Sequence, residues 1–213
     1  MSNKEEQDVL DFFSHAENLP LALSVADYVD GMRQKLNSAF WSALHARVSS
    51  EVQSRALPWT LLATEDRNTP QCLVGLHLQP SQEQTLFLRP MMEQQLMGDA
   101  LRIYYGLMWN GTPTPDKSGL KEVAALRADL LAEGYKDNES YFAWQWTNYH
   151  PRRRDFLLRY TSDMDALLDD ASALLLHFLI NHGSSLEAAN AALASAPPSM
   201  AVSLDQLRAN IKR

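Results

Sequence analysis

Apolar residues recur at helical spacing along the first quarter of the chain, and this pattern predicts one long helix over residues 21–53. Leu19-Pro20 precedes the predicted helix and Leu57-Pro58 ends it, while a shorter amphipathic helix is expected over residues 8–15. The apolar stripe of the long helix consists of Val25, Val29, Met32, Leu36, Phe40, Leu44 and Val48. Such a stripe is typical of a helix that packs one face on a core.

The middle of the chain changes to the alternating, aromatic and β-branched patterns that favour strands. The predicted strands cover residues 59–64, 71–79, 85–88, 101–110 and 141–149. Pro90 is expected to close the third strand, and residues 91–99 are expected to form a helical turn. Gly106 indicates a bulge or a close backbone approach in the fourth strand. Because residues 101–109 and 141–149 are the richest in aromatic side chains, we expect them to be antiparallel neighbours.

Helical patterns return in the last part of the chain. One helix is predicted from Asp116 or Ser118 to Glu133 and a second from Ser162 to a stop at Gly183, while Ser184 and Glu187 form a capping box for a third. Strands in series followed by helices indicate an α+β fold, with a small, mostly antiparallel sheet packed against the long N-terminal helix and the C-terminal helices. We expect a single domain over residues 1–196 and a tail or short helix over residues 197–213.

Charge and cysteine content narrow the class of protein. The chain has 213 residues and a net charge of −7, which argues against a generally basic nucleic-acid binder but leaves a local basic patch open. A single cysteine, Cys72, excludes an internal disulfide and fits a reducing cytoplasm. The polar, acidic N-terminus does not resemble a signal peptide, and no apolar run is long enough to span a bilayer. We expect a bacterial, cytoplasmic protein without membrane contact, and the sequence does not define its oligomeric state.

The stretch Y-F-A-W-Q-W-T-N-Y-H-P-R-R-R, residues 141–154, carries the candidate binding residues. If it is a regular strand, Phe142, Trp144 and Trp146 face one side and Tyr141 faces the other. Guanidinium groups bind phosphate and carboxylate bidentately, and they stack on aromatic rings. The alternative is that the tryptophans are core and the arginines a solvated strand end. The predicted binding residues are Trp144, Trp146, Tyr149, His150, Arg152, Arg153 and Arg154.

Common catalytic patterns are absent from the sequence. It contains no glycine-rich phosphate loop followed by Lys-Ser or Lys-Thr, and no Gly-x-Ser-x-Gly elbow. His177 and His182 are five residues apart, which is not a spacing that shares a helical face, so we expect no histidine ligand motif. Asp165 and Asp169 can share a face but have no third ligand. We therefore expect no catalytic residue, no cofactor and no metal site.

Three segments resemble the C-terminal region of bacterial hypothetical proteins of the PD-(D/E)XK nuclease superfamily. They are M-R-Q-K-L-N-S-A-F-W-S-A-L from Met32, L-R-I-Y-Y-G-L-M-W from Leu101 and Y-F-A-W-Q-W from Tyr141. Nuclease chemistry needs an acidic residue and then a strand with an acid and a lysine two apart. The strand V-G-L-H-L-Q from Val74 has neither, although Asp66 is available as a first acid. The resemblance therefore implies an accessory or recognition module.

The leading interpretation is a non-catalytic binding or accessory module of a bacterial system, associated with a nuclease or with defence. It holds a protein partner or a nucleic-acid backbone through the aromatic strand and the three arginines. Two alternatives stay open. One is a metal-dependent nuclease with a degenerate motif, and the other is a small acidic inhibitor or immunity-type protein that masks a basic partner with its negative charge.

Overall fold

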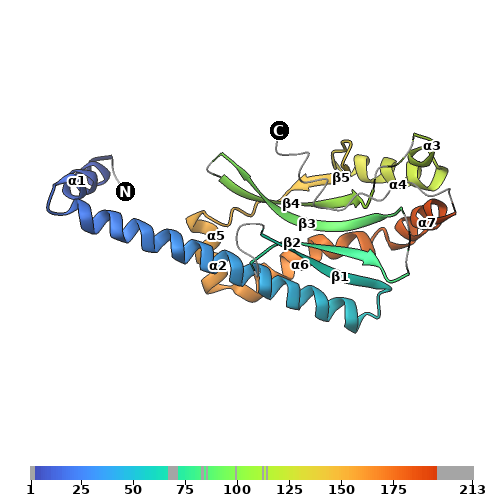
Figure 1. Ribbon diagram of the computed structural model, residues 1–213, viewed down its shortest axis with the longest axis horizontal. Coiled ribbons are helices and arrows are strands. Elements are labelled where there is room, and N and C mark those ends of the chain that lie inside the picture. Colours follow the sequence, from blue (N-terminus) through green and yellow to red (C-terminus); the bar gives the residue numbers. More distant parts are fainter. Residues whose placement is uncertain are drawn as a thin grey trace.

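The computed structural model describes residues 3–66, 72–82, 84, 86–98, 100–111, 113 and 115–195. Within these residues an antiparallel sheet of five strands packs against helices, and a helical arm projects from one end (Figure 1). This architecture confirms the predicted α+β class, with a long N-terminal helix, an antiparallel sheet and C-terminal helices. The predicted tail, residues 197–213, lies outside the described residues.

The elements follow one another in the order helices, strands, helices, strand, helices. The helices are α1 (Asn3–Ser14), α2 (Leu19–Ser54), α3 (Pro115–Ser118), α4 (Lys121–Ala132), α5 (Arg154–Ser162), α6 (Met164–Ile180) and α7 (Gly183–Ala194). The strands are β1 (Trp59–Glu65), β2 (Leu73–Pro80), β3 (Leu88–Met97), β4 (Ala100–Trp109) and β5 (Tyr141–Trp146). No helix among the described residues combines the length and apolarity needed to span a membrane.

The sheet has the strand order β1-β2-β3-β4-β5, and every neighbouring pair is antiparallel. The pairing of β4 with β5 places Tyr104 opposite Trp146 and Gly106 opposite Trp144. The prediction that the two aromatic strands are neighbours is therefore confirmed. Helices α3 and α4 form the connection between these two strands.

Strand β3 corrects the prediction of a break at Pro90 and of a helical turn after it. The strand continues from Leu88 through Pro90 to Met97, and Pro90 lies opposite Leu107 of β4. Strand β2 pairs only with residues 91–93 of β3, so the missing N–H of Pro90 interrupts no bond of that ladder. At the start of β3, the Leu88 backbone is held by Asn190 of α7. The Leu88 N–H donates to Asn190 Oδ1 at 2.8 Å, and the Leu88 carbonyl accepts from Asn190 Nδ2 at 3.0 Å.

The main core lies between one face of the sheet and the helices. The second half of α2 packs on β1 and β2, while α6 packs on β3 and β4. Trp41 of α2 is fully buried and donates its indole N–H to Gln94 Oε1 of β3 at 2.8 Å. These contacts anchor α2 to the sheet from Phe40 onward.

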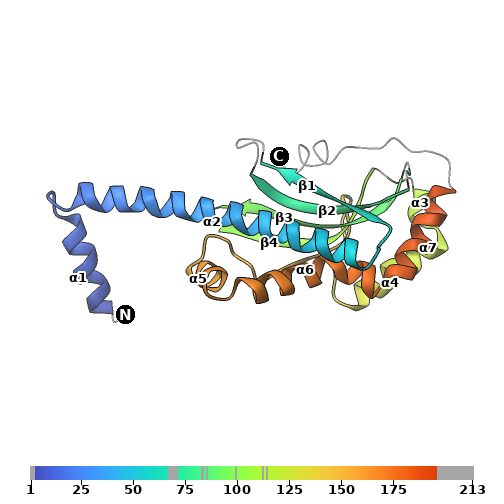
Figure 2. The ribbon, with the colours of Figure 1, turned by 90° about the horizontal axis from the view of Figure 1, so that it is seen from below.

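The first half of α2 and all of α1 form the arm, defined here as residues 3–32. Figures 1 and 2 show it extending away from the sheet and its helices. No described side chain from residue 4 to residue 32 is buried. The sequence pattern treated the α2 stripe as one core-facing surface, and this is wrong for its first half, which includes Val25 and Met32. The stripe is buried only where the sheet is near enough to cover it.

The C-terminal helices also differ from the predicted ones in detail. The region predicted as one helix up to Glu133 is two, α3 and α4, and α5 was not predicted at all. Helix α6 ends at Ile180, so Gly183 is not its stop but the first residue of α7. The N-cap of α7 is His182, with no side-chain capping bond, so the predicted capping box of Ser184 and Glu187 is not formed.

Candidate functional site

The two predicted tryptophans lie on the sheet face opposite the helices. Trp144 and Trp146 are half-buried and pack against a small second cluster of buried residues. That cluster consists of Met91, Tyr104, Met108 and Tyr141. The ring of Trp146 meets that of Tyr104 edge to face at 5.6 Å between centroids, and it meets the Trp144 ring in the same way. Both tryptophans are therefore packed on one side and accessible on the other.

A bulge in the β4–β5 ladder explains why Tyr141 joins the tryptophans. Leu107 lies opposite Ala143 but Met108 lies opposite Tyr141, so the register shifts by one residue between them. A bulge reverses the side to which the following residues point. Phe142 belongs to the main core, whereas Tyr141 belongs to the second cluster. The regular alternation predicted for this strand, with Phe142 beside the tryptophans, is therefore wrong.

Buried polar groups fix the second cluster. Tyr104 donates its hydroxyl to Glu93 Oε2 at 2.8 Å, and its oxygen lies 2.8 Å from that of Tyr141. Burial raises the pKa of Tyr104, and the neighbouring Glu93 carboxylate raises it further. His77 of β2 is also buried, and it lies opposite Met91 of the same cluster.

The cations that lie over the tryptophan rings are not the predicted ones. The Arg102 guanidinium lies 4.3 Å from the centroid of the Trp146 ring, and Lys136 Nζ lies 5.8 Å from that of Trp144. Tyr149 packs against the main core, with its ring 6.1 Å from that of Phe156, and burial raises its pKa. The aromatic and the basic halves of the predicted site thus form two separate surfaces.

His150 lies near one cation of each surface, Arg102 and Arg153. It is half-buried, and its pKa is lowered, first by burial and then by the positive charges of Arg102 and Arg153. Its neutral form is therefore favoured, so His150 adds little positive charge to either surface near neutral pH.

The three predicted arginines line an open depression of about 500 Å³ at the base of the arm. Its walls are Arg33, Arg152, Arg153, Arg154, Asp155 and Leu158. Arg33 comes from α2 and forms an ion pair with Asp30 at 3.0 Å, while Arg153 lies 3.6 Å from Asp155. Arg152 and Arg154 form no ion pair within the described residues. The structure therefore adds Arg33 to the predicted run and concentrates positive charge in an acidic chain.

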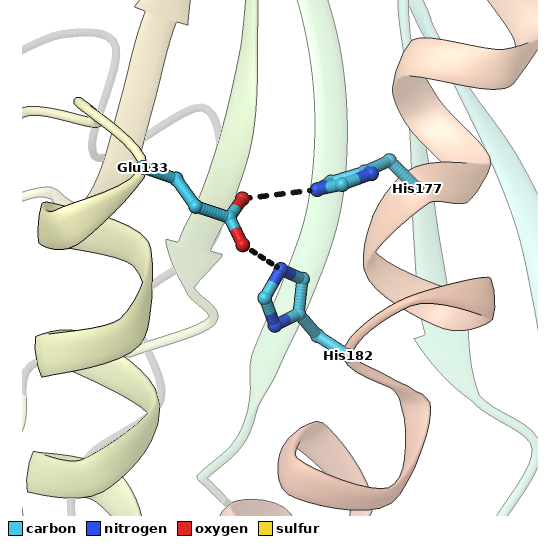
Figure 3. Close-up of side chains that lie close together, drawn as sticks. All are labelled: Glu133, His177 and His182. Atoms are coloured by element: carbon cyan, nitrogen blue, oxygen red, sulfur yellow. Dashed lines mark hydrogen bonds and ion pairs between the residues drawn. The ribbon is translucent and has the colours of Figure 1, made fainter.

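A histidine–carboxylate cluster lies at the other end of the helical layer, and the sequence pattern missed it. Figure 3 shows Glu133 pointing toward His177 and His182. His177 Nε2 lies 3.2 Å from Glu133 Oε2, and His182 Nε2 lies 3.0 Å from Glu133 Oε1. Burial alone would raise the pKa of Glu133, but the two histidines together lower it. We call these three residues the Glu-His-His cluster.

Chain geometry explains why spacing alone did not find this cluster. Because α6 ends before His182, the two histidines are not on one helix, and the turn between α6 and α7 brings their rings to 5.1 Å. Glu133 follows α4, which packs against α7. His177 and His182 therefore lie close together although their spacing does not place them on one helical face, and the expectation that they form no ligand motif stays a prediction.

The two aspartates of α6, Asp165 and Asp169, are paired with an arginine. Arg47 of α2 forms ion pairs with both Asp165 and Asp169, the former at 2.8 Å. These carboxylates tie α6 to α2 across the surface of the core. Such exposed pairs contribute about 0–1 kcal/mol each.

No family model matches this chain, and the searches of curated proteins and of solved structures find no match. The resemblance to the PD-(D/E)XK superfamily therefore stays a prediction.

Proposed function

We propose that the chain is a non-catalytic protein-binding module of a bacterial cytoplasmic system, and that its docking surface is the arm together with the arginine depression. One observation carries this proposal. Leu21, Val25, Tyr28 and Met32 form an apolar stripe on the arm, with exposed fractions of 62%, 50%, 80% and 49%. Their spacing of four, three and four residues is that of a coiled-coil seam. A continuous apolar surface on a projecting helix is typical of a protein–protein contact.

The occupant we assign to this stripe is the same stripe on a second copy of the chain. A spacing of four, three and four residues reads the same in both directions. An antiparallel pair of arms therefore places Leu21 opposite Met32 and Val25 opposite Tyr28. Each of these contacts forms twice, once from each copy. This is the self-complementarity that a two-fold symmetric interface requires.

Charge supports the same antiparallel arrangement. The arm is strongly acidic, with Lys4 as its single lysine or arginine against seven carboxylates. These carboxylates are Glu5, Glu6, Asp8, Asp11, Glu17, Asp27 and Asp30. The proposed pairing brings Glu17 of one arm level with Leu36 of the other, one turn beyond Arg33. The acidic tip of each arm would then lie beside the arginine depression of the other copy, and opposite charges would fix the register.

The oligomeric state tests the stripe. Sedimentation of the full chain at micromolar concentrations should show a dimer, because apolar burial drives association. Tyr28→Asp should weaken the dimer at least about tenfold, since it places a charge in the seam. Gln34→Asp is the matched control: Gln34 is exposed on the opposite side of the same helix and should have no effect. A wild-type monomer throughout, or equal dissociation of both variants, contradicts the proposal.

A charge exchange tests the role of the arginine depression. Replacing Arg152, Arg153 and Arg154 together by Glu should weaken the dimer, and adding Glu17→Arg to that variant should restore much of it. Circular dichroism melts should show nearly unchanged folding of the triple variant, because exposed ion pairs contribute only about 0–1 kcal/mol. A large fall in melting temperature would instead make the arginines structural.

A nucleic-acid backbone is the second candidate partner, because Arg152 and Arg154 have no ion pair within the described residues. Anisotropy of a fluorescein-labelled DNA oligonucleotide distinguishes the two partners. Binding by the monomeric Tyr28→Asp variant that falls steeply with salt and disappears on Arg152→Ala/Arg153→Ala/Arg154→Ala would favour the nucleic acid. Absence of such binding, beside a salt-sensitive dimer, favours the second copy.

A further inference from the structure

We propose that the Glu-His-His cluster binds one divalent transition-metal ion, with zinc as the reference ion. The ligands would be His177 Nε2, His182 Nε2 and a Glu133 carboxylate oxygen. The proposal is independent of the arm, which lies at the opposite end of the helical layer (Figure 1).

The distances within the cluster match those of ligands around a single ion. Zinc–nitrogen and zinc–oxygen bonds of about 2.0–2.2 Å in a tetrahedron place the ligand atoms about 3.3 Å apart. The Nε2 atoms of His177 and His182 lie 3.2 Å and 3.0 Å from the two carboxylate oxygens of Glu133. One ligand atom from each residue lies within 4.8 Å of the others. Small rotations of the three side chains would therefore suffice to surround an ion.

The chemistry of the donors selects the class of metal. Two imidazoles and one carboxylate are ligands that zinc and its first-row neighbours accept, whereas Mg²⁺ and Ca²⁺ prefer oxygen ligands only. The side chain of Glu133 is 42% exposed, so water can reach the cluster from that side. Three protein ligands and access to water are the arrangement of an open zinc site rather than of a closed structural one.

The surroundings of the two histidines also fit ligand roles. Asn181 Nδ2 lies 3.0 Å from His177 Nδ1. With the amide turned over, its oxygen would accept a hydrogen bond from Nδ1–H and leave Nε2 available for a metal, as outer partners of ligand histidines do. His182 Nε2 is shielded from solvent, and its contact with Glu133 falls outside hydrogen-bond geometry. This nitrogen thus has a nearby charge but no well-directed hydrogen bond.

The three ligands come from three different helix ends, and buried neighbours hold each of them in place. Leu130 of α4, Phe178 of α6 and Leu186 of α7 are all fully buried. A bound ion would tie α4, α6 and α7 together at this end of the molecule. Metal binding should therefore stabilise the folded chain, because the unfolded chain does not bring the ligands together.

Equilibrium dialysis of the untagged chain against zinc chloride tests the proposal. We expect one zinc ion per chain in the wild type and affinity reduced at least about tenfold in Glu133→Gln and in His177→Gln, since each removes one of three ligands. His45→Gln and Cys72→Ser are matched controls, because both residues are half-buried outside the cluster and belong to residue types that bind zinc. Neither control should change the affinity.

Thermal melting distinguishes a metal site from a plain ion pair. Zinc should raise the melting temperature of the wild type relative to the same protein in EDTA, and the increase should vanish in Glu133→Gln even if that variant is less stable in EDTA. The proposal is overturned if the wild type binds no zinc under these conditions. It is equally overturned if the cluster variants bind zinc as the wild type does, or if only Cys72→Ser loses it.

Discussion

The two halves of α2 have the same helical repeat of apolar residues and opposite environments. In the second half Phe40, Leu44 and Val48 are completely buried beneath the sheet, whereas in the first half Val25 and Tyr28 are 50% and 80% exposed. The repeat identifies the helix and the direction of its apolar face in both halves. It does not identify what lies against that face. This difference separates a body that folds on its own core from an arm whose apolar surface we assign to a second copy.

The largest expected difference between the body and the arm is the loss of stability when an aromatic side chain is removed. Trp109 of β4 is 2% exposed in the main core, so Trp109→Ala should cost about 3–5 kcal/mol of unfolding free energy. Tyr28→Ala should change the stability of the monomer by less than about 0.5 kcal/mol, because the ring is 80% exposed. Urea unfolding at low protein concentration measures both. Similar losses in the two variants would mean that the arm packs on the body in solution.

A smaller difference is expected at Gly106, the point where β4 and β5 approach most closely. A Cβ atom there would overlap the carbonyl oxygen of Ala143 and lie 2.8 Å from Trp144 Cα. Because both obstacles are backbone, the strands must move apart, and Gly106→Ala should cost about 1–3 kcal/mol or more. Denaturant melts compared with Ala143→Gly, which leaves this backbone contact in place, provide the check. An unchanged midpoint for Gly106→Ala would show that the two strands lie farther apart than the structure has them.

Local patterns in the sequence predicted the parts of the fold that local physics determines. The α+β class, the long helix, the neighbouring aromatic strands and the close approach at Gly106 all follow from periodicity, aromatic content and a glycine within a strand. Pro90 misled the prediction of β3, because a proline is tolerated wherever its missing N–H meets no partner strand. The pairing of β2 with β3 ends at His77 and Met91 although β2 itself continues to Pro80, and where this pairing ends is not a property of residues near Pro90.

The candidate sites also combine residues that the sequence predicts with residues that only the tertiary structure brings together. Arg152, Arg153 and Arg154 are adjacent in sequence and were predicted, but Arg33 reaches the depression from a helix more than a hundred residues earlier. The Glu-His-His cluster depends on the turn between α6 and α7 and on the packing of α4 against α7. One signal was present in the sequence: two histidines flanking a helix end within six residues. The carboxylate that completes the cluster lies 44 residues before His177, and only the tertiary structure shows it.

The smallest expected effect is a gain in stability, in contrast to the losses expected for Trp109→Ala and Gly106→Ala, and it concerns the arm. Gly31 is in the interior of α2, and a Cβ atom added there would meet nothing within 4 Å. Gly31→Ala should therefore stabilise the arm against local opening by up to about 1 kcal/mol, since alanine loses less backbone entropy than glycine in a helix. Hydrogen exchange of the arm amides measures this, and Ala26→Gly, at another exposed position of the same helix, should produce the reverse change. In the proposed dimer Gly31 lies beside the seam rather than in it, so the alanine should leave self-association intact. If Gly31→Ala abolishes the dimer while Tyr28→Asp does not, the contact face lies around Gly31, and the stripe from Leu21 to Met32 is not the interface.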